Sequence, residues 1–344
     1  MAEFLGIDYP TWWFLVVGGV FSGYAILDGF DLGAGAWHLF IKKEENRRIA
    51  LNAIGPVWDG NEVWLVIGGG ALFAGFPDVY ATVFSAMYIP FMLFLFVLIF
   101  RAVSIEFRSK EKMKWWRRSW DVSYSVASTL LAFLLGVVLG NILTGMPIDE
   151  TKEFTGHWLS FLNPYALMVG LTTLALLMLH GALYLIMKTE GRLYARMSVL
   201  ARSAIIFFIV TFSLVSLYSL IYIPHLTDRF KQEEWLFIVP VIAFLSIANI
   251  PRLISKRKYR QSFIFSALTI AMLLILVAVE LYPILVLSTI DPAYSLTVYN
   301  SSSSERSLEI MLIIAAIGAP LVVAYTTFVF WTFRGKVRLD DTSY

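Results

Sequence analysis

The sequence predicts an all-α integral membrane protein in which nine transmembrane helices form two four-helix bundles and one peripheral helix. Of the 344 residues, 58% are hydrophobic and 15% are charged, and the mean hydropathy is +0.72, whereas soluble domains carry about 25% charged residues. Nine stretches approach the roughly 20 apolar residues that a spanning helix needs. Lys and Arg gather in alternate connections between these stretches, as is typical of multi-pass proteins. We therefore expect a single membrane domain, residues 1–344.

The first four spans form the expected first bundle, about residues 12–143. The first span is apolar except for two acids, and the second opens with the polar group Asp59, Asn61 and Glu62. The third and fourth are apolar runs on either side of a basic segment. Their expected limits are Trp12–Phe40, Ala50–Gly75, Val79–Phe100 and Val122–Leu143.

The expected second bundle covers about residues 164–287, and a ninth, peripheral helix covers about residues 308–333. The seventh span is short and contains Pro240, and the eighth carries an isolated acid, Glu280. The expected limits of these five spans are Pro164–Met187, Ser203–Ile223, Trp235–Ile250, Ser262–Leu287 and Leu308–Phe333.

The distribution of basic residues predicts the orientation of the chain in the membrane. Of the 27 Lys and Arg residues, 23 fall in the connections on one side of the nine spans, including all seven between Arg101 and Arg118. The other side holds Lys152, Arg229, Lys231 and Arg306. Because cytoplasmic loops carry the excess of Lys and Arg, we expect the N-terminus outside and the C-terminus in the cytoplasm.

A short internal similarity supports two parallel bundles. Gly35–Glu44 and Gly181–Glu190 are identical at five of ten positions, and each segment closes a span that enters the cytoplasm, four helices apart. Such an offset is expected of a parallel duplication. The positions equivalent to the acids of the first bundle are apolar in the second, namely Leu174, Leu177 and Ile205.

Two acids inside the first span are the most informative residues of the sequence. Asp28 and Asp31 lie three residues apart and so share one helical face, interleaved with glycines that permit close helix packing. Asp31 lies nine residues before Phe40, and Asp59 nine after Ala50, so in continuous helices both lie roughly 14 Å from the cytoplasmic ends. We therefore expect Asp31 and Asp59 to face each other.

Acids inside a membrane are costly and commonly form proton relays. Asp28, Asp31, Asp59 and Glu62 could share protons along a path from the cytoplasm, because closely spaced carboxyl groups titrate as a coupled set. The alternative is structural: the same acids could bind helix ends or a neighbouring arginine and only hold the bundle together. The residues alone leave both interpretations open.

Aromatic and imidazole side chains provide fewer indications. Trp58, next to Asp59, either contacts a quinone or lipid or belongs to the interfacial aromatic belt, whereas we expect Trp12 and Trp13 to lie in that belt. A heme or copper site would need several imidazoles at matched depth, and only His38 and His180 lie in or at the ends of spans, so we expect structural or interfacial roles for both. Glu280 either extends a proton path or satisfies backbone groups near Pro283.

Composition excludes several other functions. The net charge of +2 gives no indication of nucleic-acid binding. The absence of cysteine excludes disulfides, thiolate metal sites and cysteine nucleophiles. The four histidines limit the metal and heme chemistry that this chain could support alone.

Several ordered segments closely resemble subunit II of the cytochrome bd-type quinol oxidases. They extend from the first span to the loop before the ninth. The segments are Leu27–Gly33, Pro56–Leu65, Gly69–Ala74, Arg101, Phe107–Lys110, Gly140–Pro147, Leu162–Pro164 and Ser295–Thr297.

The resemblance implies a subunit of a complex in a bacterial or archaeal cell membrane that oxidises quinol outside and reduces dioxygen to water, taking up cytoplasmic protons without pumping. The hemes, two of b type and one of d type, would be ligated by subunit I and none by this chain. Proton delivery is implied for Asp31 and Asp59, and a quinone contact for Trp58. The lipid bilayer and quinol are further expected partners, and a small single-helix subunit and a bound quinone are left open.

Three functional hypotheses remain from the sequence. The first is a subunit that conducts protons and supports subunit I, and the second is a purely structural or assembly subunit. The third is a stand-alone proton-coupled transporter, which the presence of the acids in only one half disfavours.

Overall fold

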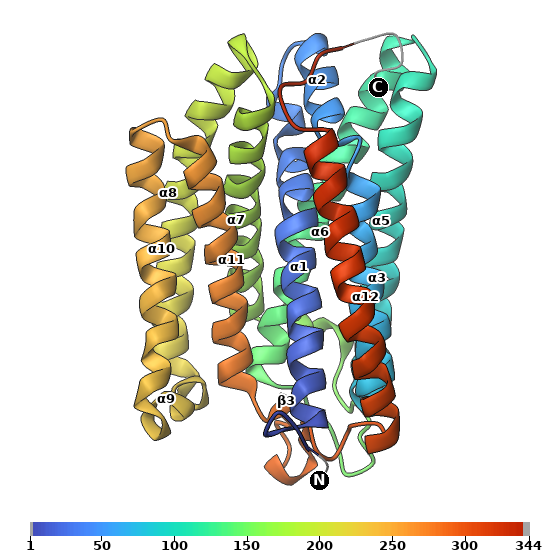
Figure 1. Cartoon of the computed structure of the whole chain (residues 1–344), viewed down its shortest axis with the longest axis vertical. Helices are drawn as coiled ribbons and strands as arrows, with labels where there is room; N and C mark the ends of the chain where they lie inside the picture. The colour runs from blue at the N-terminus through green and yellow to red at the C-terminus, as the bar shows by residue number, and fades with distance from the viewer. Residues whose placement is uncertain (1–2, 340–344) are drawn as a thin grey trace.

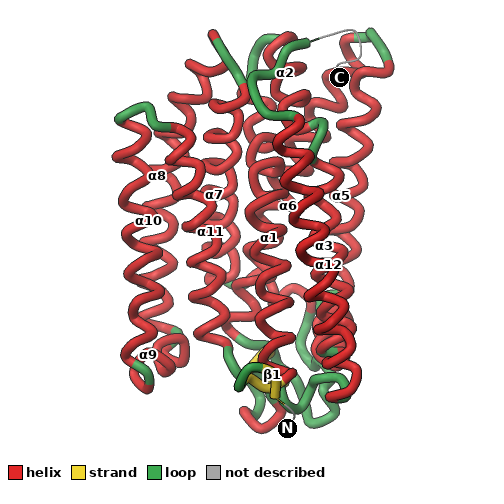
Figure 2. Tube along the Cα trace, in the orientation of Figure 1, coloured by secondary structure: helices red, strands yellow, loops and turns green. Residues whose placement is uncertain are grey.

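A chain in lipid must satisfy its backbone hydrogen bonds internally, and long helices achieve this. The computed structural model describes residues 3–339, and within them eight helical segments are long and apolar enough to cross a membrane. They run side by side, with the loops at the two ends (Figures 1 and 2). The principal helices of these segments are α1 (Tyr9–Trp37), α5 (Tyr88–Phe107), α6 (Lys114–Thr144), α7 (Pro164–Lys188), α8 (Gly191–Tyr222), α10 (Ile238–Ser255), α11 (Tyr259–Leu281) and α12 (Glu305–Thr332).

The second and third expected spans are divided in the structure. The expected span Ala50–Gly75 consists of parts of α2 (Glu44–Ile54) and α3 (Trp58–Gly75), and the next one starts within α4 (Pro77–Ala86) and continues in α5. The prediction of a continuous second helix was wrong, because Gly55 and Pro56 favour a turn at the break. α3 is not among the eight apolar segments, since its first turn is polar. A count of nine spans stays a prediction.

The helix contacts fall into two groups that meet where α1 and α6 pack on α7. In one group α3 and α6 pack on α1, and α5 packs on α6. In the other, α8 and α11 pack on α7, and α10 packs on α11. Between the groups, α6 packs along α7, and α1 packs on α7 and α11. That these groups are two separate bundles, with the predicted limits, stays a prediction.

The last helix, α12, is the most exposed of the long helices. It packs on α1, but only 6% of its most apolar window is buried within the chain. Figure 1 shows it crossing the front of the molecule, next to α1 and in front of α3 in this view. Its outward side chains are mostly apolar, among them Ile314, Leu321 and Phe328, as expected of a helix that faces lipid or another subunit.

Short elements close the two ends of the molecule. The antiparallel pairs β1 (Glu3–Phe4) with β2 (Ile7–Asp8), and β3 (Ile284–Val286) with β4 (Leu296–Thr297), lie at the end that contains the start of α1. α9 (Asp228–Gln232) lies at the same end (Figure 1). Six short 3-10 helices complete the elements of residues 3–339: η1 (His38–Phe40), η2 (Arg108–Lys110), η3 (Trp158–Leu162), η4 (Pro224–Thr227), η5 (Glu234–Phe237) and η6 (Pro292–Tyr294).

The connections that carry most of the basic residues lie together at the opposite end. α2, the α5–α6, α7–α8 and α10–α11 connections and the segment after α12 all lie there (Figure 1). Arg101 and Arg108 are exceptions to the predicted loop positions: Arg101 lies within α5, Arg108 begins η2, and both side chains are at most 1% exposed. A count of charges along the sequence does not distinguish an arginine that forms an ion pair inside the protein from an arginine in an exposed loop. The cytoplasmic position of this basic end stays a prediction.

Candidate functional site

Two glycines of α1 bring its neighbours unusually close and so fix the orientation of its acidic face. A Cβ atom at Gly33 would overlap the backbone carbonyl of Leu177 on α7, and one at Gly35 would overlap the Ser128 side chain on α6. The prediction that these glycines permit close packing is confirmed. With α6 and α7 held against these positions, the carboxylates of Asp28 and Asp31 are fully buried.

Asp28 forms an ion pair with Arg101 inside the helix bundle. Arg101 Nη2 lies 2.7 Å from Asp28 Oδ1, and Arg101 Nη1 lies 2.6 Å from Glu62 Oε2. One guanidinium thus joins α1, α3 and α5 through two carboxylates. The side chains of Arg101 and Asp28 are 0% exposed, whereas that of Glu62 is 18% exposed. The cluster is therefore closed on the α1 side and reaches the surface of the chain at Glu62.

Asp31 has a different partner. Asn61 on α3 donates a hydrogen bond of 2.7 Å from Nδ2 to Asp31 Oδ2, and the same nitrogen lies 3.2 Å from the carbonyl of Leu27. Asp31 Oδ1 has no hydrogen-bond partner in the described part of the chain, and the same holds for Asp28 Oδ2 and the Tyr24 hydroxyl. The two aspartates of the sequence motif therefore occupy different environments, one beside a cation and one beside an amide.

The charges in this cluster do not balance. Three carboxyl groups, those of Asp28, Asp31 and Glu62, surround one guanidinium, that of Arg101. If all three were ionised, the cluster would carry two uncompensated negative charges in a place that water does not reach freely. Coupled carboxyl groups in that situation share protons. The arrangement therefore contains more carboxyl groups than its one cation can neutralise.

Asp59 does not face Asp31, and this prediction was wrong. It had assumed a continuous helix from Ala50, but the chain breaks before Trp58 and rotates the start of α3. Asn61 takes the predicted place opposite Asp31, and Asp59 lies exposed in the first turn of α3. A carboxylate is favourable there because it faces the positive end of the helix dipole. Asp59 remains within electrostatic range of Glu62.

The tryptophans are more deeply buried than expected. Trp13, predicted to lie in the interfacial belt, is 5% exposed, and its indole Nε1 donates a 2.9 Å hydrogen bond to the carbonyl of Ala71 on α3. That prediction was wrong, because the bond to α3 turns the ring into the core. Trp12 is half-buried and donates to the carbonyl of Phe4. Trp58 is 7% exposed and packs in the main apolar core.

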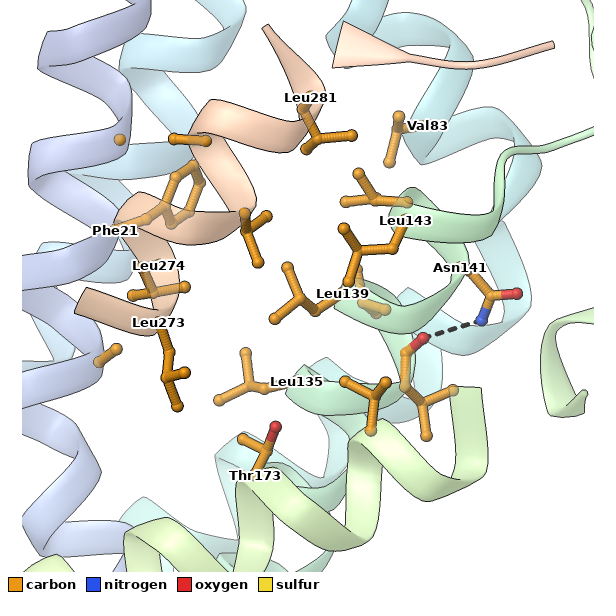
Figure 3. Close-up of a pocket in the computed structure, with 18 of the residues that line it drawn as sticks. Phe21, Val83, Leu135, Leu139, Asn141, Leu143, Thr173, Leu273, Leu274 and Leu281 are labelled. Atoms are coloured by element: carbon orange, nitrogen blue, oxygen red, sulfur yellow. Dashed lines mark hydrogen bonds between the residues drawn. The ribbon is translucent and has the colours of Figure 1, made fainter. Parts of the chain in front are cut away.

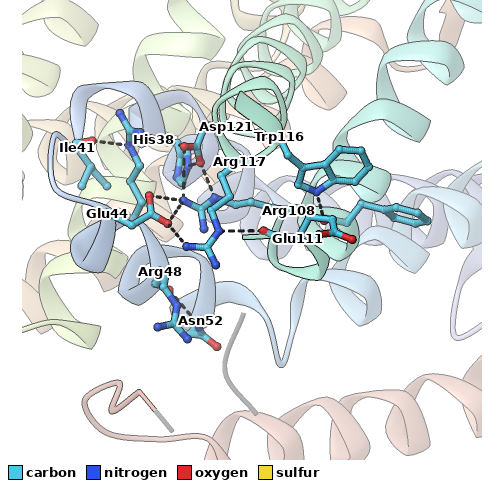
Figure 4. Close-up of polar contacts among 12 residues, drawn as sticks. His38, Ile41, Glu44, Arg48, Asn52, Arg108, Glu111, Trp116, Arg117 and Asp121 are labelled. Atoms are coloured by element: carbon cyan, nitrogen blue, oxygen red, sulfur yellow. Dashed lines mark hydrogen bonds and ion pairs between the residues drawn. The ribbon is translucent and has the colours of Figure 1, made fainter. Parts of the chain in front are cut away.

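A second buried charged network lies at the basic end (Figure 4). Asp121 on α6 is contacted by three groups: His38 Nε2 at 2.5 Å, Arg108 Nε at 2.6 Å and Arg47 Nη1 at 3.0 Å. Glu44 continues it, with its carboxylate 3.0 Å from Arg108 and 3.4 Å from Arg117. The network joins η1, which follows α1, to α2, η2 and α6, so it holds these segments together at the basic end.

His180 is a structural residue of the core. Its Nδ1 lies 2.6 Å from the Ser266 hydroxyl and its Nε2 lies 3.1 Å from the carbonyl of Ile26. The ring also stacks on Phe263, with 4.4 Å between ring centres. Both ring nitrogens thus have protein partners, which does not fit a heme-iron ligand. Among the described residues, no group of three or more His, Cys, Asp or Glu side chains is placed to hold a metal ion.

Sequence reasoning did not identify three of the residues that define these sites. Arg101 had no assigned role, although the count of acids on one face indicates that a cation is needed nearby. Asn61 was included only as a member of a polar group. Asp121 lies immediately before the expected fourth span, where an acid in a basic segment could have indicated a buried ion pair.

Comparisons with known proteins identify relatives over nearly the whole chain. Residues 9–333 match the family model described as cytochrome bd terminal oxidase subunit II. The chain is 30% identical to cytochrome bd-I ubiquinol oxidase subunit 2 of Escherichia coli (strain K12), covering 97% of each sequence. It is 34% identical to cytochrome bd ubiquinol oxidase subunit 2 of Bacillus subtilis (strain 168), covering 94% of this chain and 96% of the relative.

A solved structure has the same fold. A chain of the bd oxidase from Geobacillus thermodenitrificans superposes with a TM-score of 0.78 at 19% identity, covering 94% of this chain and 98% of that one. At this level of identity the comparison concerns the arrangement of helices alone.

Proposed function

The chain belongs to the subunit II family of cytochrome bd terminal oxidases, and we propose that it supports subunit I and conducts protons to the oxygen-reducing site. As a member it is a multi-pass cell-membrane protein and one subunit of an oxidoreductase complex that contains hemes and a partner subunit I. The complex oxidises quinol, and the finer assignments below are proposals.

The charge imbalance around Arg101 is the observation that carries the proton proposal. Reduction of dioxygen to water consumes protons, so an oxidase needs a protonatable path through its membrane part. Buried carboxyl groups in excess over their counter-charge serve this purpose. Asp28 and Glu62 each form an ion pair with Arg101, whereas the side-chain partner of Asp31 is the neutral amide of Asn61. We assign Asp31 as the principal carrier and Asp28 as its electrostatic neighbour.

Asp59 and Glu62 form the side of the proposed path that opens to the surroundings of the chain. Asp59 is exposed in the first turn of α3, and Glu62 is partly exposed three residues later. An exposed acid on a membrane helix favours contact with another protein rather than with lipid. We propose that this face of α3 lies against subunit I and that protons pass there between the subunits.

The cofactor assignments follow from the family and from the poor fit of this chain to metal ligation. Heme iron needs free axial ligands, and the rings of His38 and His180 are held by Asp121 and by Ser266 with Ile26. We propose that two hemes of b type and one of d type belong to subunit I. A quinone contact at Trp58 and a small single-helix subunit stay predictions, and the buried position of Trp58 gives the former no support.

The purely structural hypothesis keeps one supporting observation. The ion pair between Arg101 and Asp28 joins two helices and would stabilise the bundle whether or not protons pass. A stand-alone transporter has no such support, because the acids lie in the first half of the chain and the equivalent residues of the second half are apolar.

Substitution of the acids in the assembled oxidase distinguishes these hypotheses. We expect Asp31→Asn, in complexes with full heme content, to slow oxygen consumption and cytoplasmic proton uptake by on the order of tenfold or more, and Asp59→Asn to have a smaller effect. Glu45→Gln, an exposed position on α2, is the matched control. Unchanged proton uptake in Asp31→Asn would exclude the relay, and loss of assembly would support the structural role.

A further inference from the structure

A large apolar cavity lies between the two groups of helices. Its volume is about 1690 Å³, larger than the roughly 300–1,000 Å³ of sites for small ligands. Figure 3 shows leucines of α6 and α11 and Phe21 of α1 pointing into it. Leu135, Leu139 and Leu273 are among these side chains. A space of this size and lining suits long hydrocarbon chains.

One carboxyl group, that of Glu280, faces this cavity. It belongs to the lining and is the last residue but one of α11. Within residues 3–339 it has no ion pair or hydrogen bond, in contrast to Asp28, Glu62 and Asp121. An ionised acid without a partner on a membrane helix is unfavourable unless a ligand or another group compensates its charge.

The position of Glu280 along α11 places it at the level of lipid head groups. α11 begins at Tyr259, directly after the basic α10–α11 connection, and Glu280 lies 21 residues further on, roughly 32 Å away along the helix. That distance is close to the thickness of the bilayer core, about 30 Å. The carboxyl group therefore lies near the membrane surface opposite the basic end, while the leucines lie deeper.

Other polar groups line the same end of the cavity. The hydroxyl groups of Tyr165 and Ser219 lie 2.9 Å apart. Lys231 of the neighbouring α9 also belongs to the lining, and its ammonium group lies 2.8 Å from Asp228. The cavity thus presents an anion, a cation and hydroxyl groups at one end, and the rest of its lining is mostly apolar.

We propose that the cavity binds a phospholipid whose head group contains a primary amine. The ammonium would donate hydrogen bonds to Glu280, the phosphate would lie toward Lys231, and the acyl chains would occupy the space beside Leu135 and Leu139. A quinone head group is neutral and offers acceptor oxygens, so it does not complement a carboxylate. An anionic lipid would be repelled by it. The site is independent of the proposed proton path.

Lipid analysis of the purified oxidase complex tests the proposal. We expect phosphatidylethanolamine to be retained by the wild-type complex after detergent washing, and its amount to fall roughly tenfold in Glu280→Gln, because a charge-assisted hydrogen bond is lost. Glu309→Gln is the matched control, since Glu309 lies on α12, pairs with Arg306 and does not line the cavity. It should retain the lipid.

A second measurement uses defined lipids. Adding phosphatidylethanolamine to the delipidated wild-type complex should raise its Tm, and phosphatidylglycerol with the same acyl chains should not. Leu139→Trp narrows the space proposed for the acyl chains but keeps the carboxyl group, so it should weaken this response and decides the question if Glu280→Gln does not assemble. Three results would overturn the proposal. They are an equal rise in Tm with both lipids, an amount of bound phosphatidylethanolamine in Glu280→Gln or Leu139→Trp equal to that of the wild type, and retention of quinone in place of the phospholipid.

Discussion

The guanidinium of Arg101 lies 2.7 Å from the carboxylate of Asp28, and neither side chain is exposed at all. The same guanidinium holds Glu62 from the other side. An ion pair without water is stable only when its geometry and hydrogen bonding are good. Arg101 links three helices, α1, α3 and α5. Within the described residues it is also the only arginine or lysine that forms an ion pair with the acids of this cluster.

Replacing Arg101 should be among the most damaging single substitutions in the chain. Arg101→Met leaves Asp28 buried without its cation, and removing one partner of a buried pair costs about 3–5 kcal/mol. We expect a strongly reduced yield of assembled complex and a lower Tm. Arg101→Met combined with Asp28→Asn and Glu62→Gln removes the unpaired charges and should recover part of the loss. If the triple variant is no more stable than Arg101→Met, buried charge is not the cause.

The sequence predicted the helical membrane architecture and the burial of two acids on one face of the first helix, because both depend on local composition and spacing. It did not predict the partners. Whether Asn61 or Asp59 faces Asp31 depends on the break before α3, which rotates the helix after Pro56. The pairing of Asp121 with Arg108 depends on how η2 approaches α6 in space. Contacts between segments that are far apart in the sequence depend on how the helices pack, and the spacing of residues along the sequence carries no information about this packing.

Enlarging Gly181 should separate α1 from α7. A Cβ at this position would overlap the backbone of Gly33 and Ala34, and overpacking of this kind costs typically 1–3 kcal/mol. We expect Gly181→Ala to lower the Tm of the complex and to perturb the acidic cluster on α1. Gly318→Ala is the matched control, because Gly318 is also within a helix but has open space around its Cβ position. An equal effect of the two substitutions would refute a specific role for the α1–α7 contact.

The loop after α6 should become less ordered in acid. Hydrogen bonds from Thr151, and also from the backbone of Glu153, lower the pKa of the exposed Asp149 carboxyl below its usual range. This pKa is lower in the folded than in the unfolded chain. The ionised Asp149 therefore stabilises the loop fully at pH values above the pKa that Asp149 has in the unfolded chain. The stabilisation is lost as the pH falls through the pKa that Asp149 has in the folded chain. Proteolysis of the loop should therefore accelerate at low pH in the wild type. Asp149→Asn should show a rate with little dependence on pH over that range.

The network around Asp121 predicts an ordering of two substitutions. Asp121→Asn leaves Arg47 and Arg108 without the carboxylate that holds them, so it should cost about 3–5 kcal/mol, as expected when a buried ion pair loses one partner. His38→Ala removes a single hydrogen bond to a charged group and some packing, and should cost less, about 1.5–3 kcal/mol for the hydrogen bond. Thermal unfolding of the assembled complex, monitored by the release of heme, measures both costs.

In variants of this network that still assemble, cytoplasmic proton uptake per oxygen reduced should be unchanged, because this network holds helices together and the carboxyl excess lies around Arg101. If His38→Ala had normal stability but slower proton uptake, the Asp121 network would not be purely structural, and His38 would belong to the proton path.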